Sequence, residues 1–257
     1  MTSLQLDKLL TGQVFALLFI FCRVSPVVLL LPGFGETYVS PRMRGTFGLI
    51  ISFLLIGPLM PIIPSPPAGI PDMVKLLGIE IGIGIFFGSV VRLIMSTLET
   101  IGFIIALQTG LSNATVFNPA LATQSSLPSA FMSVAGLVLI FATGLDHLML
   151  RSVAATYELF PPGIALPFGD MAQSFGQSLS RSFRIGIELA SPFLLTGTLI
   201  VVAMGMMQKL MPQVQLFLVM LPVQIYGGLF LLMITIATIM ELWMIYFSQT
   251  INAFFSR

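Results

Sequence analysis

Charged residues are absent from four long stretches of this chain. No Asp, Glu, Lys or Arg lies between Arg44 and Asp72, between Glu99 and Asp146, between Glu188 and Lys209, or between Lys209 and Glu241. Each stretch can hold a membrane-crossing helix, which needs about 20 apolar residues. Only 8% of the 257 residues are charged, against about 25% in a typical soluble domain. The chain is therefore predicted to be a polytopic integral membrane protein.

Six apolar blocks follow one another, separated by proline and glycine. They cover residues 11–31, 45–60, 73–108, 130–150, 184–208 and 216–248. Because lipid cannot pair with backbone polar groups, and no period-two alternation indicates a barrel, each block is predicted to be helical. The third and sixth blocks exceed one span, so we expect tilting, a break or extension beyond the bilayer. The predicted fold is all-α, a single membrane-embedded domain with parts at 1–128 and 129–257.

The three main linkers differ in composition. Six prolines between residues 58 and 71 predict an extended, stiff connection. Residues 107–128 are uncharged and rich in Ser, Thr and Asn, with a turn at Asn118-Pro119. This neutral loop fits either a pore or pocket or a solvated surface. The third linker, 159–181, combines Pro161-Pro162-Gly163 with Ser and Gln and is predicted to be an exposed connection.

Some charged residues lie within or beside the apolar blocks: Arg23, Glu80, Arg92, Glu99 and Glu241. An unpaired charge there costs several kcal/mol, so each is expected to point away from lipid, toward a partner, an interface or water. Glu80 and Arg92 are too far apart along one helix to pair, whereas residues 184 and 188 have the i, i+4 spacing of a helical ion pair. Structural pairing and a proton or ion relay both stay open, although no single helix carries a stack of carboxylates.

Glycines recur at helical spacing in the third block, at Gly78, Gly82, Gly84 and Gly88. They form two overlapping small-xxx-small registers, which allow a second helix backbone to approach closely. The spacing predicts a helix-packing surface. It does not distinguish packing within this chain from packing against another subunit.

Candidates for catalysis and metal binding are sparse. His147 is the only histidine and follows Asp146, but adjacent helix positions point in different directions and no second His completes a metal site. Cys22 is the only cysteine, which rules out an internal disulfide. The motif Gly110-Leu-Ser112, together with a lone His, is too short to indicate an intramembrane serine protease. No phosphate-binding Gly-Lys-Ser/Thr motif is present. A net charge of +1 gives no basic field that would attract nucleic acid, so none is expected to bind. Because the catalytic and ligand constellations are missing, the chain is expected to bind no metal or cofactor and not to be an enzyme.

Four stretches together resemble one family, the FliR family of flagellar export-gate subunits, which has SctT-like relatives in virulence-type secretion. They are Pro32-Gly-Phe-Gly-Glu36 with Arg42-Met-Arg44; Glu80-Ile-Gly-Ile-Gly84 running to Gly88; Ala106-Leu-Gln-Thr-Gly-Leu-Ser112 with Asn118-Pro119; and Met207-Gln-Lys-Leu-Met-Pro-Gln213 leading to Leu221-Pro222. Each is weak alone, but they occur in the family's order across nearly the whole chain. The first stretch is more similar to the flagellar branch than to the virulence branch.

The resemblance implies a subunit of the flagellar type III protein export gate in the bacterial inner membrane, at the flagellum basal body. It implies one copy of this chain assembled with FliP-like and FliQ-like membrane subunits, and with other export-apparatus proteins, as helical hairpins within a larger hetero-oligomer surrounded by membrane lipid. Unfolded flagellar proteins would pass through the central channel.

The resemblance also implies that a loop after the third block helps to plug the channel. The matching positions lie within 107–122 and include Leu107, Gln108, Gly110, Leu111, Ser112, Phe117, Asn118 and Pro119. A neutral, partly apolar loop suits a plug, because no buried charge is stranded when a substrate displaces it. Phe103 and Asn118 stand where many relatives carry an acidic residue, which argues against any mechanism that needs a carboxylate there.

Two other classes of function compete with the gate subunit. A small-molecule or ion transporter would show inverted repeats and broken helices that meet at a polar midplane site, and the sequence has no convincing internal repeat. An intramembrane enzyme is disfavoured by the single histidine and by the missing metal ligands.

Overall fold

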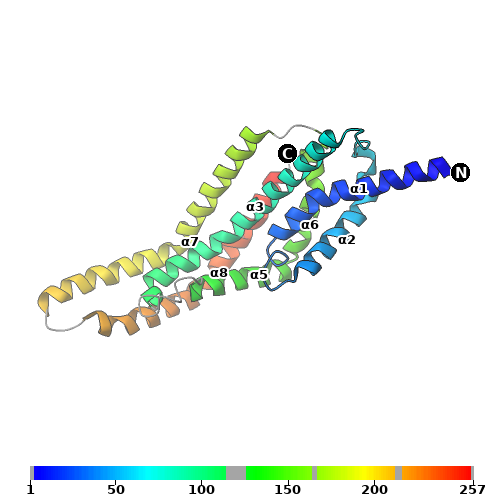
Figure 1. The fold of residues 1–257 in the computed structure, drawn as a ribbon. Helices are drawn as coiled ribbons and strands as arrows, with labels where there is room; N and C mark the ends of the chain where they lie inside the picture. The colour runs from blue at the N-terminus through cyan, green and yellow to red at the C-terminus, as the bar shows by residue number, and fades with distance from the viewer. Residues whose placement is uncertain (1–2, 114–125, 164–166, 212–215, 256–257) are drawn as a thin grey trace. The chain divides into compact units, whose positions relative to one another are not determined.

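The computed structural model describes residues 3–113, 126–163, 167–211 and 216–255, and all regular structure in these ranges is helical (Figure 1). The helices are α1 (Ser3–Leu30), α2 (Pro41–Leu59), η1 (Met60–Ile62), α3 (Ile70–Gln108), η2 (Leu111–Asn113), α5 (Leu127–Ala142), α6 (Leu145–Leu159), α7 (Phe168–Leu210) and α8 (Leu216–Phe255). The all-α prediction is confirmed.

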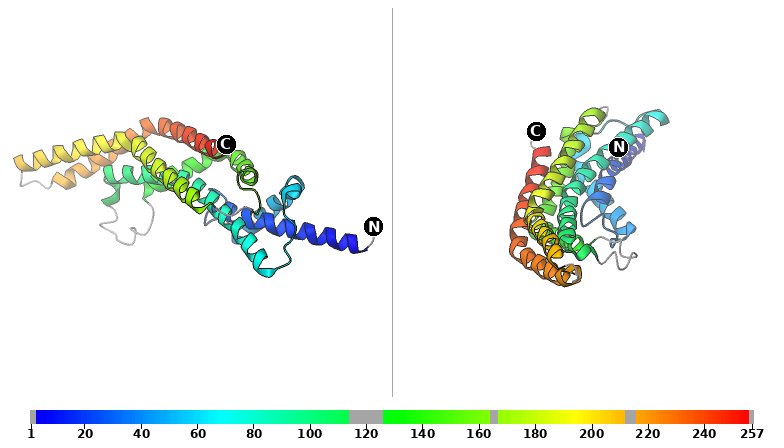
Figure 2. Two further views of the ribbon diagram at one scale, coloured as in Figure 1. Left: turned by 90° about the horizontal axis from the view of Figure 1, so that it is seen from above. Right: turned by 90° about the vertical axis from the view of Figure 1, so that its left-hand side faces the viewer.

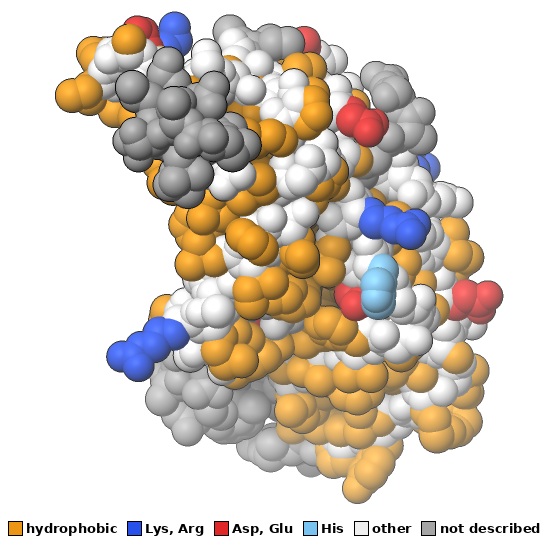
Figure 3. Space-filling view, turned by 90° about the vertical axis from the view of Figure 1, so that its right-hand side faces the viewer, with side chains coloured by type: hydrophobic (Ala, Val, Ile, Leu, Met, Phe, Trp, Pro, Cys, Tyr) orange, Lys and Arg blue, Asp and Glu red, His pale blue; other side chains and the backbone are white. Residues whose placement is uncertain are grey.

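Five described helical segments are long and apolar enough to cross a membrane: Gly12–Leu30, Pro41–Ile62, Ile70–Gln108, Phe168–Leu210 and Val219–Phe254. The pair α5 and α6 adds a sixth if it is counted as one broken span. Hydrophobic side chains cover much of the face drawn in Figure 3, and few charged side chains lie among them. The predicted class of polytopic membrane protein is therefore confirmed.

Two helices begin with the same local signal. Ser40 precedes α2 and Ser126 precedes α5, and each serine Oγ accepts a hydrogen bond from the backbone N–H three residues later, at 3.3 Å. A proline follows within the first two helical positions, where its missing N–H is no loss. These caps fix where α2 and α5 start.

The fourth apolar block, predicted over 130–150, is not one helix. It is interrupted after Ala142, and α6 begins at Leu145. Gly144 has a φ of 74°, a left-handed conformation that residues with a side chain rarely adopt. Asp146 and His147 follow this glycine closely, but apolar residues resume at Leu148, so the block is predicted as continuous although it is broken here.

The connection predicted over 159–181 is wrong in its second half, because α7 already starts at Phe168. Residues 168–183 are polar on several faces but contain no proline, and Ser and Gln each cost less than about 0.7 kcal/mol in a helix. Similarly, α2 continues through Pro58, and η1 occupies 60–62, so the stiff extended linker is shorter than predicted. Pro192 and Pro222 lie inside α7 and α8, as membrane helices tolerate.

The chain forms two compact units, each built from separate parts of the sequence. The first comprises Met1–Leu93, Gly144–Ser178 and Gln249–Arg257, and the second comprises Ile94–Thr143 and Leu179–Ser248. The long helices α3, α7 and α8 contribute to both units. The single domain divided at residue 128 stays a prediction.

In the first unit α1 packs against α2 and α3. Phe19, Ile20 and Val24 of α1 are completely buried, and Gly48 of α2 lies 3.5 Å, measured from the position a Cβ would take, from the ring of Phe21. Tyr157 of α6 is also buried. A buried stripe along α1 thus organises this unit.

In the second unit the lone tryptophan, Trp243 of α8, is completely buried and its indole N–H donates to the carbonyl of Ile94 at 3.2 Å. Gly136 of α5 faces it, since a side chain there would start 3.4 Å from the indole and would overlap Leu98 of α3. At Gly102 a Cβ would lie only 2.6 Å from the backbone nitrogen of Ser129. Helices α3 and α5 therefore approach almost backbone to backbone. Figures 1 and 2 show α7 and α8 running side by side in the same unit.

Hydroxyl side chains in the helices donate to backbone carbonyls of the same helix. Examples are Ser52 to Gly48 at 2.6 Å, Thr196 to Pro192 at 2.9 Å and Thr235 to Leu231 at 2.8 Å. This bond spares a membrane helix an unsatisfied hydroxyl in lipid. These serines and threonines are thus compatible with the spans assigned above.

Trp243→Ala should lower the free energy of unfolding of the purified chain in mild detergent by about 3–5 kcal/mol, because it empties the centre of the second unit. Denaturant unfolding followed by circular dichroism measures this loss. Ile245→Ala, on the same helix but 45% exposed, is the matched control and should cost clearly less. Equal losses for the two variants would contradict the assigned core.

Candidate functional site

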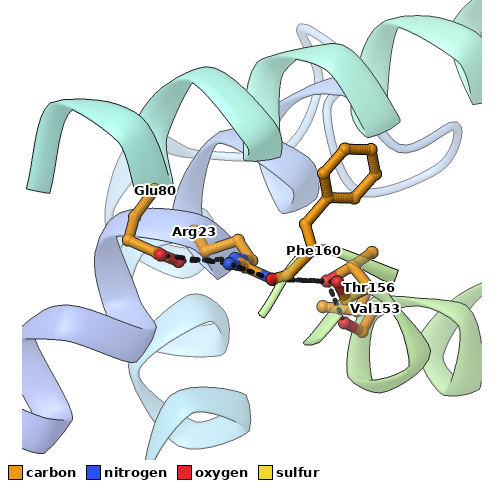
Figure 4. A network of polar contacts seen from close by, with 5 residues as sticks. All are labelled: Arg23, Glu80, Val153, Thr156 and Phe160. Carbon is orange, nitrogen blue, oxygen red and sulfur yellow. Dashed lines mark hydrogen bonds and ion pairs between the residues drawn. The ribbon is translucent and has the colours of Figure 1, made fainter. Parts of the chain in front are cut away.

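Arg23 and Glu80 form a fully buried ion pair in the first unit (Figure 4). Arg23 Nε donates to Glu80 Oε2 at 2.5 Å, and Nη2 donates to Oε1 at 3.0 Å. Two parallel bonds between a guanidinium and a carboxylate give both strength and a fixed orientation. The pair joins the C-terminal third of α1 to α3.

The remaining donors of Arg23 reach the C-terminal end of α6. Nη1 donates to the carbonyl of Thr156 at 3.0 Å, and Nη2 donates to the carbonyl of Phe160 at 3.0 Å. The carbonyls at the end of a helix carry partial negative charge, which a cation stabilises, and the Thr156 carbonyl accepts from Arg23 in addition to the backbone N–H of Phe160. The guanidinium also lies 3.9 Å from the ring centroid of Tyr157. One side chain therefore fastens three helices, α1, α3 and α6, to one another.

Arg23 and Glu80 are among the charges that the sequence predicts to need partners. The sequence does not predict that they pair with each other, or that Arg23 binds the carbonyls at the end of α6. The partners lie 57, 133 and 137 residues from Arg23 along the chain. Backbone carbonyls carry no sequence signal, so only the folded structure can reveal them.

The predicted glycines divide between two environments. Gly84 lies against the backbone carbonyl of Arg23, and a Cβ at Gly88 would lie 2.7 Å from Cβ of Leu30, so both face α1. Gly78 is exposed, with no atom within 4 Å of its Cβ position, and Gly82 is half-buried. The close approach at Gly84 brings α1 and α3 together beside the Arg23–Glu80 pair.

Arg92 pairs with an acidic residue that was not predicted as its partner. Its Nη1 donates to Glu36 Oε1 at 2.6 Å, and both side chains are partly exposed. Glu36 ends the Pro32–Glu36 motif, so the motif supplies the counter-ion for α3. Arg184 pairs with Glu188 at 2.7 Å, as the i, i+4 spacing predicted.

Glu99 and Glu241 are exposed in this chain. The backbone carbonyl of Glu99 accepts a hydrogen bond from Ser129 Oγ at 3.1 Å, while its carboxylate is not part of that contact. The five predicted charges thus comprise one buried pair, one arginine paired at the surface, and two exposed glutamates.

The plug-loop residues begin where α3 ends. Leu107 is exposed, Gln108 is the last residue of α3, and Gly110 turns the chain with a φ of 75° before η2, which contains Leu111 and Ser112. Phe117, Asn118 and Pro119 lie outside the described residues. In the second unit a cavity of about 250 Å³ adjoins this point, lined by Gln108 and Thr109 together with residues of α7 and α8. Gly197 lies against the Gln108 side chain and Gly228 against Thr109.

Asp146 and His147 lie together at the start of α6, with 3.1 Å between His147 Nδ1 and Asp146 Oδ1. The His147 ring is 81% exposed. Among the described residues no three His, Cys, Asp or Glu side chains gather to hold a metal ion. The polar groups that the structure brings together serve helix packing and helix ends.

These features define a class: an all-helical polytopic membrane protein whose buried polar groups join helices. Residues 14–250 match the family described as bacterial export proteins, family 1. The chain belongs to this family, whose members are transport components and not enzymes. The resemblance inferred from the four motifs is thereby confirmed.

Curated relatives extend over nearly the whole chain. The flagellar biosynthetic protein FliR of Caulobacter vibrioides is 32% identical over 246 residues, which cover 94% of this chain and 96% of the relative. The protein of the same name from Bacillus subtilis is 26% identical, covering 92% of each chain. The Yop proteins translocation protein T of Yersinia pestis is 27% identical over 59% of each chain.

Arg23→Met should lower the free energy of unfolding of the purified chain in mild detergent by about 3–5 kcal/mol, because Glu80 and the end of α6 lose their buried partner. The double variant Arg23→Met with Glu80→Met should recover part of this loss, since no uncompensated charge remains. Arg184→Met, which breaks an exposed pair, is the control and should change stability little. If Arg23→Met proved no more costly than Arg184→Met, the network would not hold the helices together.

Proposed function

We propose that this chain is a subunit of the flagellar type III protein export gate. In this role it forms part of the inner-membrane channel at the flagellum basal body, through which unfolded flagellar proteins leave the cell. The observation that carries the proposal is the match to flagellar relatives over more than 90% of the chain. The buried ion pair and the close helix contacts support a passive scaffold, because they fix helices against one another.

The exposed apolar faces support a role as one subunit among several. In the most apolar 18-residue stretch of the α2 span, and likewise in that of α7, only 17% is buried within the chain. Phe53 and Leu54 on α2, and Leu195 and Leu199 on α7, are more than half exposed. Faces of this kind are covered by lipid or by other membrane proteins. FliP-like and FliQ-like subunits are the proposed partners, together with lipid and other export-apparatus proteins.

The loop within 107–122 is proposed as the channel plug. The described part of it is uncharged, begins at the C-terminal end of a 39-residue helix, and adjoins the cavity beside Gln108 and Thr109. A neutral loop can block ions by packing against apolar walls, and it can be displaced without exposing a buried charge.

The equivalent gate subunit of a virulence-type secretion system is the alternative. It is supported by the 27% identity to the Yersinia pestis protein, but that match covers 59% of the chain, whereas the flagellar relative covers 94%. A transporter of small molecules or ions has less support, because the family that matches residues 14–250 is described as export proteins.

A gate subunit should be recovered from the membrane together with its partners. The tagged chain, extracted from its native membrane in mild detergent, should bring along two other small hydrophobic proteins in excess over itself. Mass spectrometry identifies them and separates the flagellar from the virulence branch. Gly78→Leu should leave the thermal unfolding of the chain unchanged but reduce recovery of these partners at least tenfold, because the exposed glycine would no longer admit a close helix.

Gly88→Leu is the matched comparison for this test. Its side chain would meet Leu30, so it should destabilise the chain itself. If Gly78→Leu recovered partners at the wild-type level, this part of α3 would not be an interface. Recovery of the wild-type chain alone, as a monomer or homodimer, would overturn the export-gate proposal and favour a transporter.

A plug loop should be needed to keep the channel closed to ions. Deleting residues 114–119 should leave partner recovery intact but raise the ion conductance of proteoliposomes that contain the assembled complex, because the shortened loop cannot close the channel. A Gly-Ser replacement of equal length is the control that separates loss of length from loss of side chains. Unchanged conductance in the deletion variant would rule out a plug at this position.

A further inference from the structure

A cavity of about 410 Å³ lies in the first unit, where the segment 31–40 turns into α2. Its walls are almost entirely apolar and include Val28, Phe34, Phe47 and Ile50. The rings of Phe34 and Phe47 are stacked, with 4.6 Å between their centroids, and keep one wall rigid. The volume falls within the range of about 300–1,000 Å³ that is usual for small-molecule sites.

Two arginines also line this cavity, Arg42 and Arg44 of the first turn of α2. Arg44 is held in place because its Nε and Nη2 donate to the carbonyl of Val39 at 3.0 and 2.8 Å. Arg42 is exposed, and no acidic side chain of the described residues forms an ion pair with either arginine. The nearby carboxylate of Glu36 is occupied by Arg92. The cavity therefore combines an apolar interior with uncompensated positive charge.

The position of the cavity along α2 narrows the choice of ligand. The candidate span Pro41–Ile62 starts at this end, so both arginines lie where the hydrocarbon region gives way to the polar headgroups. Ile50 continues the cavity wall into an exposed apolar face with Leu49, Phe53 and Leu54. An acyl chain can follow this face while its phosphate stays at the arginines.

We propose that this cavity binds an anionic phospholipid. The phosphate is held by Arg42 and by the free Nη1 of Arg44, and an acyl chain lies against Phe47, Ile50 and the outer face of α2. Basic pockets at the ends of membrane helices recognise anionic headgroups in this way. The site gives a role to the Arg42-Met-Arg44 motif, and it does not depend on the export role.

The chain is purified together with the subunits that accompany it. Phosphatidylglycerol or phosphatidylcholine is then added in increasing amounts, and native mass spectrometry counts the lipids bound. Phosphatidylglycerol should bind in preference to phosphatidylcholine. Arg42→Gln should weaken its binding about fivefold, whereas Arg151→Gln, which removes an equal charge from an exposed position on α6, should not. Ile50→Trp, which fills the cavity without changing charge, should also weaken binding.

Four outcomes would overturn the proposal. Equal binding of the two lipids, or wild-type binding by both Arg42→Gln and Ile50→Trp, would show that the cavity does not select an anionic lipid. Displacement of phosphatidylglycerol by inorganic phosphate at the same concentration would indicate a site for a free anion. A photo-crosslinker at position 50 that captured a protein subunit in place of lipid would assign the cavity to a protein interface.

Discussion

The first unit depends on the need to neutralise one charge in an apolar environment. Arg23 has no access to water, so its five N–H donors must all find acceptors within the protein, and an unpaired donor there costs more than the bond it would make. Glu80 supplies two acceptor atoms, and the end of α6 supplies three more, the carbonyls of Thr156 and Phe160 and the Thr156 hydroxyl. Because acceptors from α3 and from the end of α6 have to meet at a single planar group carried by α1, the network restricts the rotation and the height of each of these three helices. Apolar packing alone would restrict the rotation and the height of the helices less strongly.

The second unit is fixed by shape. Gly102 and Gly136 remove side chains where α3 and α5 cross, and Trp243 fills the space that remains. Between helices in lipid such close contact gains dispersion energy, which replaces the hydrophobic driving force available in water. The chain thus uses two different devices, a buried ion pair in one unit and small residues around a large aromatic in the other. Each is suited to helices that share long apolar surfaces.

Helix content and membrane class could be predicted from the sequence because both follow from hydropathy, which is a local property. The break at Gly144 was not predicted, because Asp146 and His147 interrupt the apolar run only briefly and the left-handed backbone angle of the glycine is seen only in the folded chain. The early start of α7 was missed because Ser and Gln are common to loops and to the polar face of a helix. At the site, the charges that need partners were recognisable, and the i, i+4 pair at Arg184 was paired correctly. The long-range partners of Arg23 and Arg92 depend on the tertiary fold. The residues proposed for the plug were named from the motif resemblance, because the neutral composition of residues 107–122 fits a plug and a solvated loop equally well.

The uncovered apolar faces of α2 and α7 have a consequence for how the cell can make this protein. A chain that buries so little of these faces within itself is exposed to non-native association from the moment it enters the bilayer until its neighbours arrive. Copies made in excess of their neighbours would be substrates for membrane proteases or would aggregate. In the proposed role as one subunit among several, synthesis of this chain is therefore expected to be matched in time and amount to that of its partners.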